Sequence, residues 1–341
     1  MTDPGPGPDV SAGAVVGVDV GGTKILAGVV APDGTVLATA VRPTPARDGS
    51  VQLLEAAVDE AVEEAVGAAD DVGRAGAVAG VGVAAAGFVD AGRERVMFAP
   101  HLPWRGEAVR RRFADRWGVP VVLDNDANAA AWAEFRHGAA QGAGTAVVVT
   151  VGTGIGSAIV LGGGPEGAGR LLRGLNGMAG ELGHQQVVPN GEPCECGGRG
   201  CWEQYASGNA LVAFARARVG REATVLDDWC GGVPERLTGP MVTAAAEADD
   251  LVALQAFAAI GDWLGVGLAN VTAALDPDVI VVGGGVSAAG DRLLEPARAA
   301  LSRSLVGAAH RRLPPVRRAV LGPEAAIVGA AAMVRSALDV R

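Results

Sequence analysis

Apolar and polar positions alternate with two different periods along this chain, which predicts a mixed α/β protein. The segment Val15–Val30 consists of a β-branched run, a Gly-Gly-Thr turn and a second β-branched run, which is typical of two strands joined by a tight turn. Residues Ala146–Leu161 repeat this pattern around another glycine turn. Two copies, roughly one domain length apart, indicate two similar α/β halves.

The rest of the chain alternates between short buried-strand patterns and helical spacing. Further strands are expected at Val36–Thr39, Ala77–Ala85, Val119–Leu123 and Val279–Val282. Helices are expected at Ser50–Ala69, Glu107–Trp117, Ala127–Phe135, within a helical region from Asn209 to about Gln255, at Ala258–Leu275 and at Glu324–Leu338. The segment Pro165–Glu203 has neither period and is predicted to be a loop-rich insertion.

This order of elements predicts two domains and an N-terminal tail. Residues 1–13 are rich in Pro and Gly and are expected to form a disordered tail. We expect an N-terminal α/β domain at 14–137 plus 322–341, and a C-terminal α/β domain at 138–321.

Composition narrows the class of protein. The 341 residues carry 28 Lys+Arg and 38 Asp+Glu, a net charge of −10, which lacks the basic footprint of a nucleic-acid binder. Hydrophobic residues make up 49%, which excludes wholesale disorder. The longest uncharged stretch, 138–165, is broken by glycines and does not resemble a membrane span. With no signal peptide pattern at the N-terminus, we expect a cytoplasmic protein with no membrane partner.

Three glycine clusters follow predicted strands and could approach phosphate. A strand rather than a helix follows the first two, which argues against a P-loop and against a dinucleotide-binding fold. Glycines and threonine at a hairpin tip can still present backbone N–H and hydroxyl donors to an anion, although such tips are more often plain turns. The three clusters are Gly21-Gly22-Thr23 (two residues after Asp19), Gly152-Thr153-Gly154 and Gly283-Gly284-Gly285.

Asp124-Asn125-Asp126 ends a predicted strand and opens a helix. Asn and Asp are favoured at helix N-caps, which accounts for one of the three residues. The carboxyl end of a strand in an α/β sheet is also where ligands bind, so Asp126 could accept a proton from a substrate hydroxyl while Asn125 fixes that substrate. The pattern alone leaves both interpretations open.

One histidine and three cysteines have the composition of a zinc site. His184 is followed by Cys194, Cys196 and Cys201, a set that suits tetrahedral Zn²⁺. Because all four positions are protein ligands, the metal of this loop, 184–201, should be structural. Zinc would also bring Glu181 and Glu203, which flank the cluster, close together; the alternative is two exposed loop glutamates.

These motifs together resemble the ROK family of sugar kinases and sugar-responsive repressors, within the actin-like ATPase superfamily. The resemblance covers nearly the whole chain after the tail, and the segment Trp202–Gly208 is similar to the zinc-containing, ATP-dependent glucokinases of actinobacteria. Its specific pieces are DVGGTK (Asp19–Lys24), DNDANAAAWAE (Asp124–Glu134), GTGIG (Gly152–Gly156), ELGH (Glu181–His184), CECGGRGCWE (Cys194–Glu203) and PDVIVVGGG (Pro277–Gly285).

The resemblance implies the fold and a role for each matched residue. The fold would be two actin-like (ribonuclease H-like) α/β domains with an interdomain cleft and a zinc-bound loop. Asp126 would be the catalytic base, and the sugar would be bound by Gly87, Asn125, Glu181, His184 and Glu203. ATP would be bound by Gly21, Gly22, Thr23, Gly152, Thr153, Gly154, Gly283, Gly284 and Gly285, Mg²⁺ would be served by Asp19, and Zn²⁺ would be held by His184, Cys194, Cys196 and Cys201.

The expected reaction is the transfer of phosphate from MgATP to the 6-hydroxyl of D-glucose. The alternatives are another hexose or N-acetylhexosamine (N-acetylmannosamine, N-acetylglucosamine or fructose), polyphosphate as the donor, and a catalytically inactive sugar sensor. Repressors of the family need a DNA-binding region ahead of the kinase-like part, and only about thirteen tail residues precede the first predicted strand. The resemblance also implies a homo-oligomer, either a dimer or a tetramer.

Two residues fall outside these assignments. Lys24 is the only lysine among 28 basic residues, which suggests that arginine does not serve there, although chance survival is the simpler explanation. His101 stands where many relatives carry asparagine, so no contact is carried over to that position.

Overall fold

The computed structural model describes residues 13–46, 49–71, 73, 76–162 and 169–339. The predicted tail therefore lies, except for Gly13, outside the described residues. Contacts divide the chain into two compact units: unit 1 comprises 1–142, 159–180 and 321–341, and unit 2 comprises 143–158 and 181–320. The domain boundaries expected from the sequence stay a prediction.

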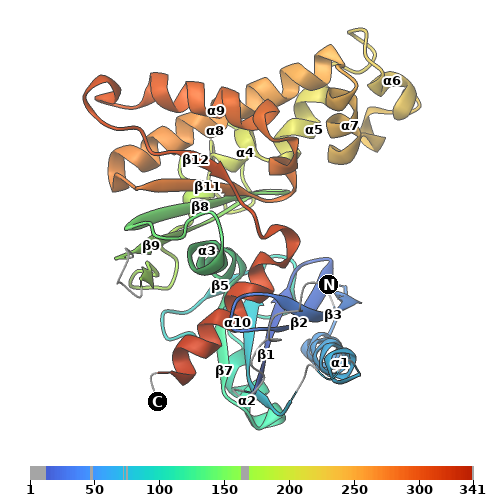
Figure 1. The fold of residues 1–341 in the computed structure, drawn as a ribbon. Coiled ribbons are helices and arrows are strands. Elements are labelled where there is room, and N and C mark those ends of the chain that lie inside the picture. The colour runs from blue at the N-terminus through green and yellow to red at the C-terminus, as the bar shows by residue number, and fades with distance from the viewer. Residues whose placement is uncertain (1–12, 47–48, 72, 74–75, 163–168, 340–341) are drawn as a thin grey trace, which may run out of the picture. The chain divides into compact units, whose positions relative to one another are not determined.

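A five-stranded mixed sheet forms the centre of unit 1 (Figure 1). Its strand order is β3-β2-β1-β4-β7, in which β1, β2 and β3 are antiparallel neighbours and β1, β4 and β7 run parallel. The parallel strands therefore end at one edge of the sheet, where an α/β fold binds ligands. The strands are β1 (Ala14–Val20), β2 (Lys24–Val30), β3 (Val36–Pro43), β4 (Val78–Ala85) and β7 (Val121–Asn125).

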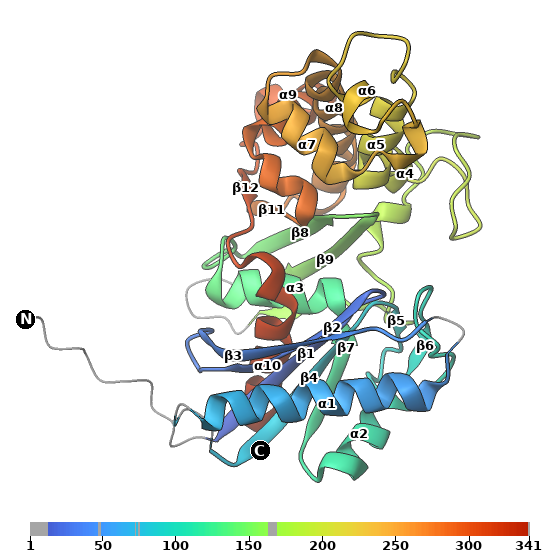
Figure 2. The ribbon, with the colours of Figure 1, turned by 90° about the vertical axis from the view of Figure 1, so that its right-hand side faces the viewer.

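Helices cover both faces of this sheet because side chains alternate along β1. Val16 and Val18 belong to the buried cluster that includes α1 (Val51–Asp70), which lies along the sheet in Figure 2. Val15 packs on the other face with Ile327 of α10 (Ala325–Leu338). Asp19 has the same parity as Val15, so it lies on the face of α10.

Glycine in β1 lets α10 approach the sheet backbone. A Cβ built on Gly17 would lie 1.9 Å from the carbonyl oxygen of Ile327. The next helix on this face, α3 (Asp126–His137), meets α10 equally closely, since a Cβ on Gly329 would lie 1.7 Å from the oxygen of Ala129. This packing fixes where α3 begins, at the edge where the parallel strands end.

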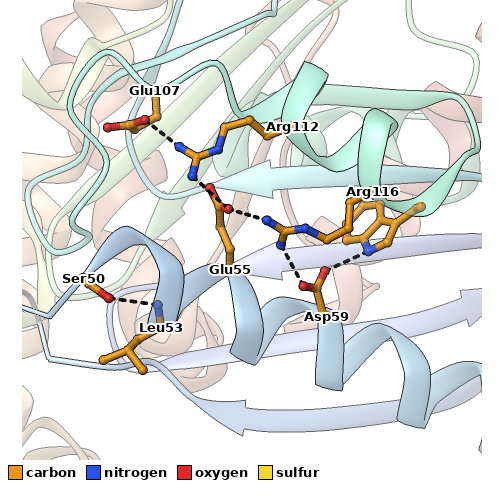
Figure 3. A network of polar contacts seen from close by, with 8 residues as sticks. Ser50, Leu53, Glu55, Asp59, Glu107, Arg112 and Arg116 are labelled. Carbon is orange, nitrogen blue, oxygen red and sulfur yellow. Dashed lines mark hydrogen bonds and ion pairs between the residues drawn. The ribbon is translucent and has the colours of Figure 1, made fainter.

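A buried carboxylate ties α2 (Val109–Trp117) to α1 (Figure 3). The side chain of Glu55 is 1% exposed, and its Oε2 lies 2.8 Å from Arg116 Nη2 and 3.2 Å from Arg112 Nη2. Asp59 pairs with the other end of Arg116 at 2.7 Å and accepts a hydrogen bond from the indole of Trp117. Burial without such partners would be costly for Glu55, so the two arginines set the docking of α2.

The second sheet repeats the strand order of the first. It runs β10-β9-β8-β11-β12, with a hairpin at one side and parallel strands β8, β11 and β12 at the other. The predicted internal duplication is therefore confirmed. The strands are β8 (Thr145–Val151), β9 (Ile155–Leu161), β10 (Arg170–Leu171), β11 (Val279–Gly283) and β12 (Val316–Arg318), and β5 (Phe88–Val89) pairs with β6 (Val96–Phe98) in unit 1.

Helices make up most of the rest of unit 2. Glycines on α8 (Leu251–Leu275) let α9 (Asp291–Ser304) pack closely, since a Cβ on Gly265 would lie 2.3 Å from the oxygen of Ala297. The α8 helix is long and apolar enough to cross a membrane, yet 56% of its most apolar window is buried, as in a core helix. The other helices are α4 (Glu203–Ala206), α5 (Gly208–Arg216), α6 (Leu226–Trp229), α7 (Gly239–Glu247), η2 (Leu182–His184), η3 (Pro234–Arg236), η4 (Gly285–Ala289), η5 (Ala308–His310) and, in unit 1, η6 (Gly322–Glu324).

The predicted α/β fold class and the main elements are confirmed, with differences in extent. The strand expected at Val36–Thr39 continues to Pro43, and the apolar helix expected from Ala258 already begins at Leu251. The helical region after Asn209 is divided into shorter helices. The strands β5, β6, β10 and β12 were not predicted, because strands of two or three residues are too short to show a period.

Candidate functional site

The first glycine cluster forms the tip of the β1–β2 hairpin. The N–H of Gly21 donates to the oxygen of Lys24 at 3.1 Å, and Thr44 holds the tip from outside. The Thr44 hydroxyl donates to the oxygen of Gly21 at 2.7 Å and its N–H donates to the oxygen of Thr23. Gly22 and Thr23 are exposed, and a Cβ on Gly22 would lie 2.7 Å from Cβ of His101. The tip is therefore both open to solvent and held in place.

Asp19 lies at the base of this tip and shares a sheet face with the lone lysine. Asp19 pairs with Leu26 across β1 and β2, and Lys24 is two residues from Leu26, so all three point to the same face. Burial and, to a smaller extent, the charge of Asp126 raise the pKa of Asp19 to about 7, against the opposing charge of Lys24. A site in which carboxylates repel one another favours a bound cation.

Asn125 is the N-cap of α3, so the helix-capping interpretation holds for this residue. Its side-chain oxygen accepts the N–H groups of Ala127 at 2.8 Å and Asn128 at 3.1 Å. Its Nδ2 donates to the oxygen of Gly87 at 3.1 Å and to Asp126 Oδ1 at 2.9 Å. Gly87 itself packs tightly against the backbone of Phe98, since a Cβ added to Gly87 would lie only 2.7 Å from the oxygen of Phe98.

Asp126 is oriented through one of its two carboxylate oxygens. Oδ1 accepts from Asn125 Nδ2 and from the N–H of Ala127, each at 2.9 Å. Burial raises the pKa of Asp126 above its ordinary value, although these hydrogen bonds oppose the change. A carboxylate whose pKa is moved towards neutrality can accept a proton from a hydroxyl group.

Asp124 positions the same strand end and has a partner that the sequence did not reveal. Its Oδ2 accepts from Arg173 Nε at 2.9 Å and Nη2 at 2.5 Å. Its Oδ1 accepts from Asn128 Nδ2 and from the N–H of Asn125. Arg173 lies 49 residues away in a loop without a motif, so no local pattern could have identified it.

The predicted zinc ligands lie together in unit 2. One ligand atom from each of His184, Cys194, Cys196 and Cys201 lies within 4.8 Å of all the others. Cys196 Sγ and Cys201 Sγ are 3.6 Å apart, and Cys194 Sγ is 3.6 Å from His184 Nδ1. Tetrahedral bonds of about 2.3 Å to sulfur and 2.0 Å to nitrogen require edges of about 3.6–3.8 Å, so the donor set fits Zn²⁺.

Glu203 links this cluster to the second glycine hairpin. Its Oε1 accepts from Cys194 Sγ at 3.2 Å and lies 3.5 Å from His184 Nδ1. Its Oε2 accepts from the N–H of Ile155 at 3.3 Å. Burial and the hydrogen bond to Glu203 raise the pKa of Cys194 to about 12, so a cation is needed to make a thiolate favourable here. Glu181 directly precedes η2, and its oxygen accepts the N–H of His184.

The second hairpin tip and the third glycine cluster meet at a cavity of about 620 Å³ in unit 2. The tip is held by the start of α5, where the N–H of Gly208 donates to the oxygen of Gly152 at 2.7 Å. Gly284 has φ +83° and a Cβ there would lie 2.4 Å from the oxygen of Val151, so glycine is required. The lining includes Gly152, Thr153 and Gly285 from the two glycine clusters, and also Asn209, Thr243, Glu247 and Val286, which no motif had indicated.

Comparisons with known proteins identify the family of this chain. Residues 15–337 match the model of the ROK family. A glucokinase of Streptomyces coelicolor is 40% identical over 327 residues, 95% of this chain and 98% of that protein. The crystal structure of a ROK family glucokinase from Streptomyces griseus in complex with glucose and AMPPNP superposes with a TM-score of 0.83 at 42% identity, covering 95% of this chain and 100% of that one. The xylose repressor of Bacillus subtilis is 26% identical over 95% of this chain and 77% of its own.

Proposed function

The chain belongs to the ROK family, and from this premise we propose that it is a glucokinase that transfers the γ-phosphoryl group of ATP to the 6-hydroxyl of D-glucose. The observation that carries the proposal is the placement of Asp126, which is held by Asn125 through one carboxylate oxygen beside the charge of Asp19. The relatives from Streptomyces species, one of them bound to glucose and AMPPNP, support the substrates.

Asp126 is proposed to be the general base. Phosphoryl transfer needs mainly positioning and charge stabilisation, so a carboxylate that orients the hydroxyl and accepts its proton is sufficient. Because Asn125 occupies Oδ1, the proton would be accepted at Oδ2. The raised pKa of Asp126 brings it closer to the operating pH, where general-base catalysis is most efficient.

The cavity of unit 2 is proposed to take the adenosine part of ATP. Its 620 Å³ lies within the range typical of small-molecule pockets. Gly152 and Thr153 at one side would offer backbone N–H and hydroxyl donors to phosphate, and Gly285 at the other side would lie beside the nucleoside. In unit 1, the exposed tip Gly21–Thr23 would bind phosphate in the same way.

Asp19 is proposed to hold Mg²⁺. The residues fit, because the raised pKa of Asp19 reflects repulsion and burial that a cation would relieve. Mg²⁺ is typically held by one or two carboxylates together with substrate phosphates, and it neutralises charge that develops on the transferred group.

The residues that the family resemblance assigns to sugar hydroxyl groups are proposed as glucose contacts, each within its own unit. Asn125 and Gly87 would contribute from unit 1, and Glu181, His184 and Glu203 from unit 2. His184 presents Nδ1 to the cysteine cluster, which leaves Nε2 for a sugar hydroxyl. Zinc would fix the imidazole orientation, so we propose that it has a structural role that also shapes the sugar site.

One assay tests the proposed activity against its alternatives. Release of ADP is measured with a panel of hexoses and N-acetylhexosamines, first with ATP and then with polyphosphate. The proposal expects the highest kcat/KM for glucose with ATP. A clear preference for another sugar or for polyphosphate would replace the substrate assignment. Glucose binding by calorimetry without any turnover would favour a sugar sensor.

The Asp126→Asn variant tests the base. We expect kcat to fall by about 10³-fold or more, with an unchanged circular dichroism spectrum, because the amide is similar in shape and cannot accept the proton. Asp115→Asn, which neutralises an exposed carboxylate on α2, serves as the matched control and should leave kcat unchanged. Near-full turnover by Asp126→Asn would contradict the assignment.

A further inference from the structure

A second cavity, of about 230 Å³, lies in unit 1 and has a strongly basic lining. It is built from the β5–β6 turn, α3, the β10 segment and α10. The polar side chains around it are Arg93, Arg136, Arg170, Arg173 and Ser336, together with the indole of Trp132. Among the described residues that line it there is no carboxylate, although the whole chain carries a net charge of −10.

Of the four arginines that line this cavity, only Arg173 has an ion pair among the described residues. Arg173 is paired with Asp124, whereas Arg136 lies over the ring of Trp132 at 5.9 Å, and no ion pair is found among the described residues for Arg93. Burial lowers the pKa of Arg93, and the charge of Arg173 lowers it further. Bringing like charges together in a half-buried pocket is unfavourable unless an anion joins them.

The position of Arg93 is set by its turn. Its φ is +57°, its N–H donates to the oxygen of Asp90 at 2.9 Å, and Asp90 Oδ1 accepts the N–H groups of Glu94 and Arg95. A non-glycine residue in this conformation is uncommon and is held here by its neighbours. The backbone that carries Arg93 at the edge of the cavity is therefore held in a defined turn.

A buried donor at the cavity also lacks a partner. The side chain of Trp132 is 7% exposed, and its Nε1–H has no hydrogen-bond acceptor among the described residues. A buried donor left without an acceptor costs about 1–3 kcal/mol, and indole N–H groups usually find one. Trp132 also lines the cavity, so the signal of its indole can report on what the cavity holds.

We propose that this cavity binds a small phosphomonoester, and that the bound ligand slows the kinase reaction by competing with Asp124 for Arg173. Arginine guanidinium groups match phosphate oxygens in charge and in geometry. Leu171 and Met333 give the cavity an apolar side for a few attached carbon atoms. Its volume is below that of typical drug-sized pockets, so the ligand must be small.

Competition at Arg173 connects the cavity to the strand end that carries Asp126. Asp124 Oδ1 holds the N–H of Asn125 and the side chain of Asn128, while Oδ2 is held by Arg173. If a bound phosphate pairs with Arg173, the buried carboxylate of Asp124 loses its ion pair, and its hydrogen bonds to Asn125 and Asn128 are weakened. Effects on ligand binding and on glucose affinity are then reciprocal.

Binding is tested without catalysis, through the indole N–H signal of Trp132 in the full chain. Of the six tryptophan indole signals, that of Trp132 is assigned by its loss in Trp132→Phe. Titration with glycerol 3-phosphate should shift this signal at lower concentration than inorganic phosphate, and chloride at equal ionic strength should not shift it. An equal response to chloride, or none to either phosphate, would overturn the proposal.

Variants separate this site from the kinase site. Arg93→Gln/Arg136→Gln should raise the dissociation constant for glycerol 3-phosphate at least tenfold, whereas Arg111→Gln, an exposed arginine outside the cavity, should not change it. Melting curves check that both variants fold. This arm does not depend on the proposed function. The glucose assay does rest on the proposed function. In that assay, glycerol 3-phosphate should lower kcat of the wild type and of Arg111→Gln but not of the double variant. Equal inhibition of all three proteins would overturn the regulatory role.

Discussion

At the scale of single residues, ionisation of Asp19 sets a pH dependence of stability. Its pKa is about 7 in the folded protein against 3.8 for an ordinary aspartate, so the folded state holds the proton more tightly. The stability gained from this proton is complete below pH 3.8 and is lost as the pH rises through 7. Ionised Asp19 therefore destabilises the protein at neutral pH unless a cation is bound.

The Asp19→Asn variant, which cannot ionise, should show this directly. Without Mg²⁺, we expect it to be more stable than the wild type by about 2 kcal/mol at pH 8, roughly half of the full linkage because Asp19 is partly exposed. The difference should shrink towards zero below pH 4. Urea unfolding at several pH values measures it, and a difference independent of pH would contradict the shifted pKa.

Lys24 acts on the same carboxylate. Its positive charge lowers the pKa of Asp19, so Lys24→Gln should raise that pKa and move the acidic limb of kcat/KM for MgATP to higher pH by a few tenths of a unit. Lys24→Arg keeps the charge and should leave the limb in place. Identical profiles for all three proteins would mean that the lone lysine is a chance survival.

At the scale of elements, Gly267 on α8 leaves space for the indole ring of Trp202, which follows the predicted zinc ligand Cys201. A Cβ on Gly267 would lie 2.0 Å from the ring of Trp202, which is fully buried and donates from Nε1 to the oxygen of Trp263. Trp202 stands between Cys201 and Glu203 in the chain. The space that Gly267 leaves for the Trp202 ring therefore helps to set the positions of Cys201 and Glu203.

The Gly267→Ala variant should reveal this dependence. We expect a loss of about 1–3 kcal/mol of unfolding free energy through overpacking, together with weaker glucose binding. Gly67→Ala in α1 is the matched control, since no atom lies within 4 Å of its added Cβ, and it should be neutral or stabilising by about 0.5 kcal/mol. Thermal melts and glucose KM values measure both effects. An unchanged melt for Gly267→Ala would show that Trp202 can move freely.

At the scale of the whole molecule, two sheets with the same strand order carry different attachments. In unit 1, β1 ends one residue after Asp19 and β7 ends at Asn125, while unit 2 adds the His/Cys cluster and the 620 Å³ cavity. The duplicated framework therefore supports two chemically distinct sets of residues. The expected dimer or tetramer stays a prediction.

Removal of zinc should affect more than the loop that binds it. Cys196→Ala is expected to abolish zinc binding, lower the melting temperature and raise the glucose KM about tenfold or more, because His184 loses its fixed orientation. Cys230→Ala is the matched control, since Cys230 is buried outside the cluster. Metal analysis and steady-state kinetics measure these effects. A fully active wild type that contains no zinc would contradict the prediction.

The sequence by itself determined the features that are local along the chain. The hairpin tips, the helix start at Asn125 and the clustering of the four predicted zinc ligands each depend on residues within about twenty positions of one another, so spacing alone could predict them. The order of the larger strands and helices followed from their periods for the same reason.

Only the tertiary structure decided which distant residues meet. The pairing of Arg173 with Asp124, the cavity lined by four arginines and the effect of Asp126 on the pKa of Asp19 depend on strand register and helix packing. No short-range pattern encodes these contacts, because burial and charge act through space between segments that the fold brings together. The pKa values of Asp19 and Asp126 are therefore properties of the folded protein, and the chemistry proposed for them depends on it.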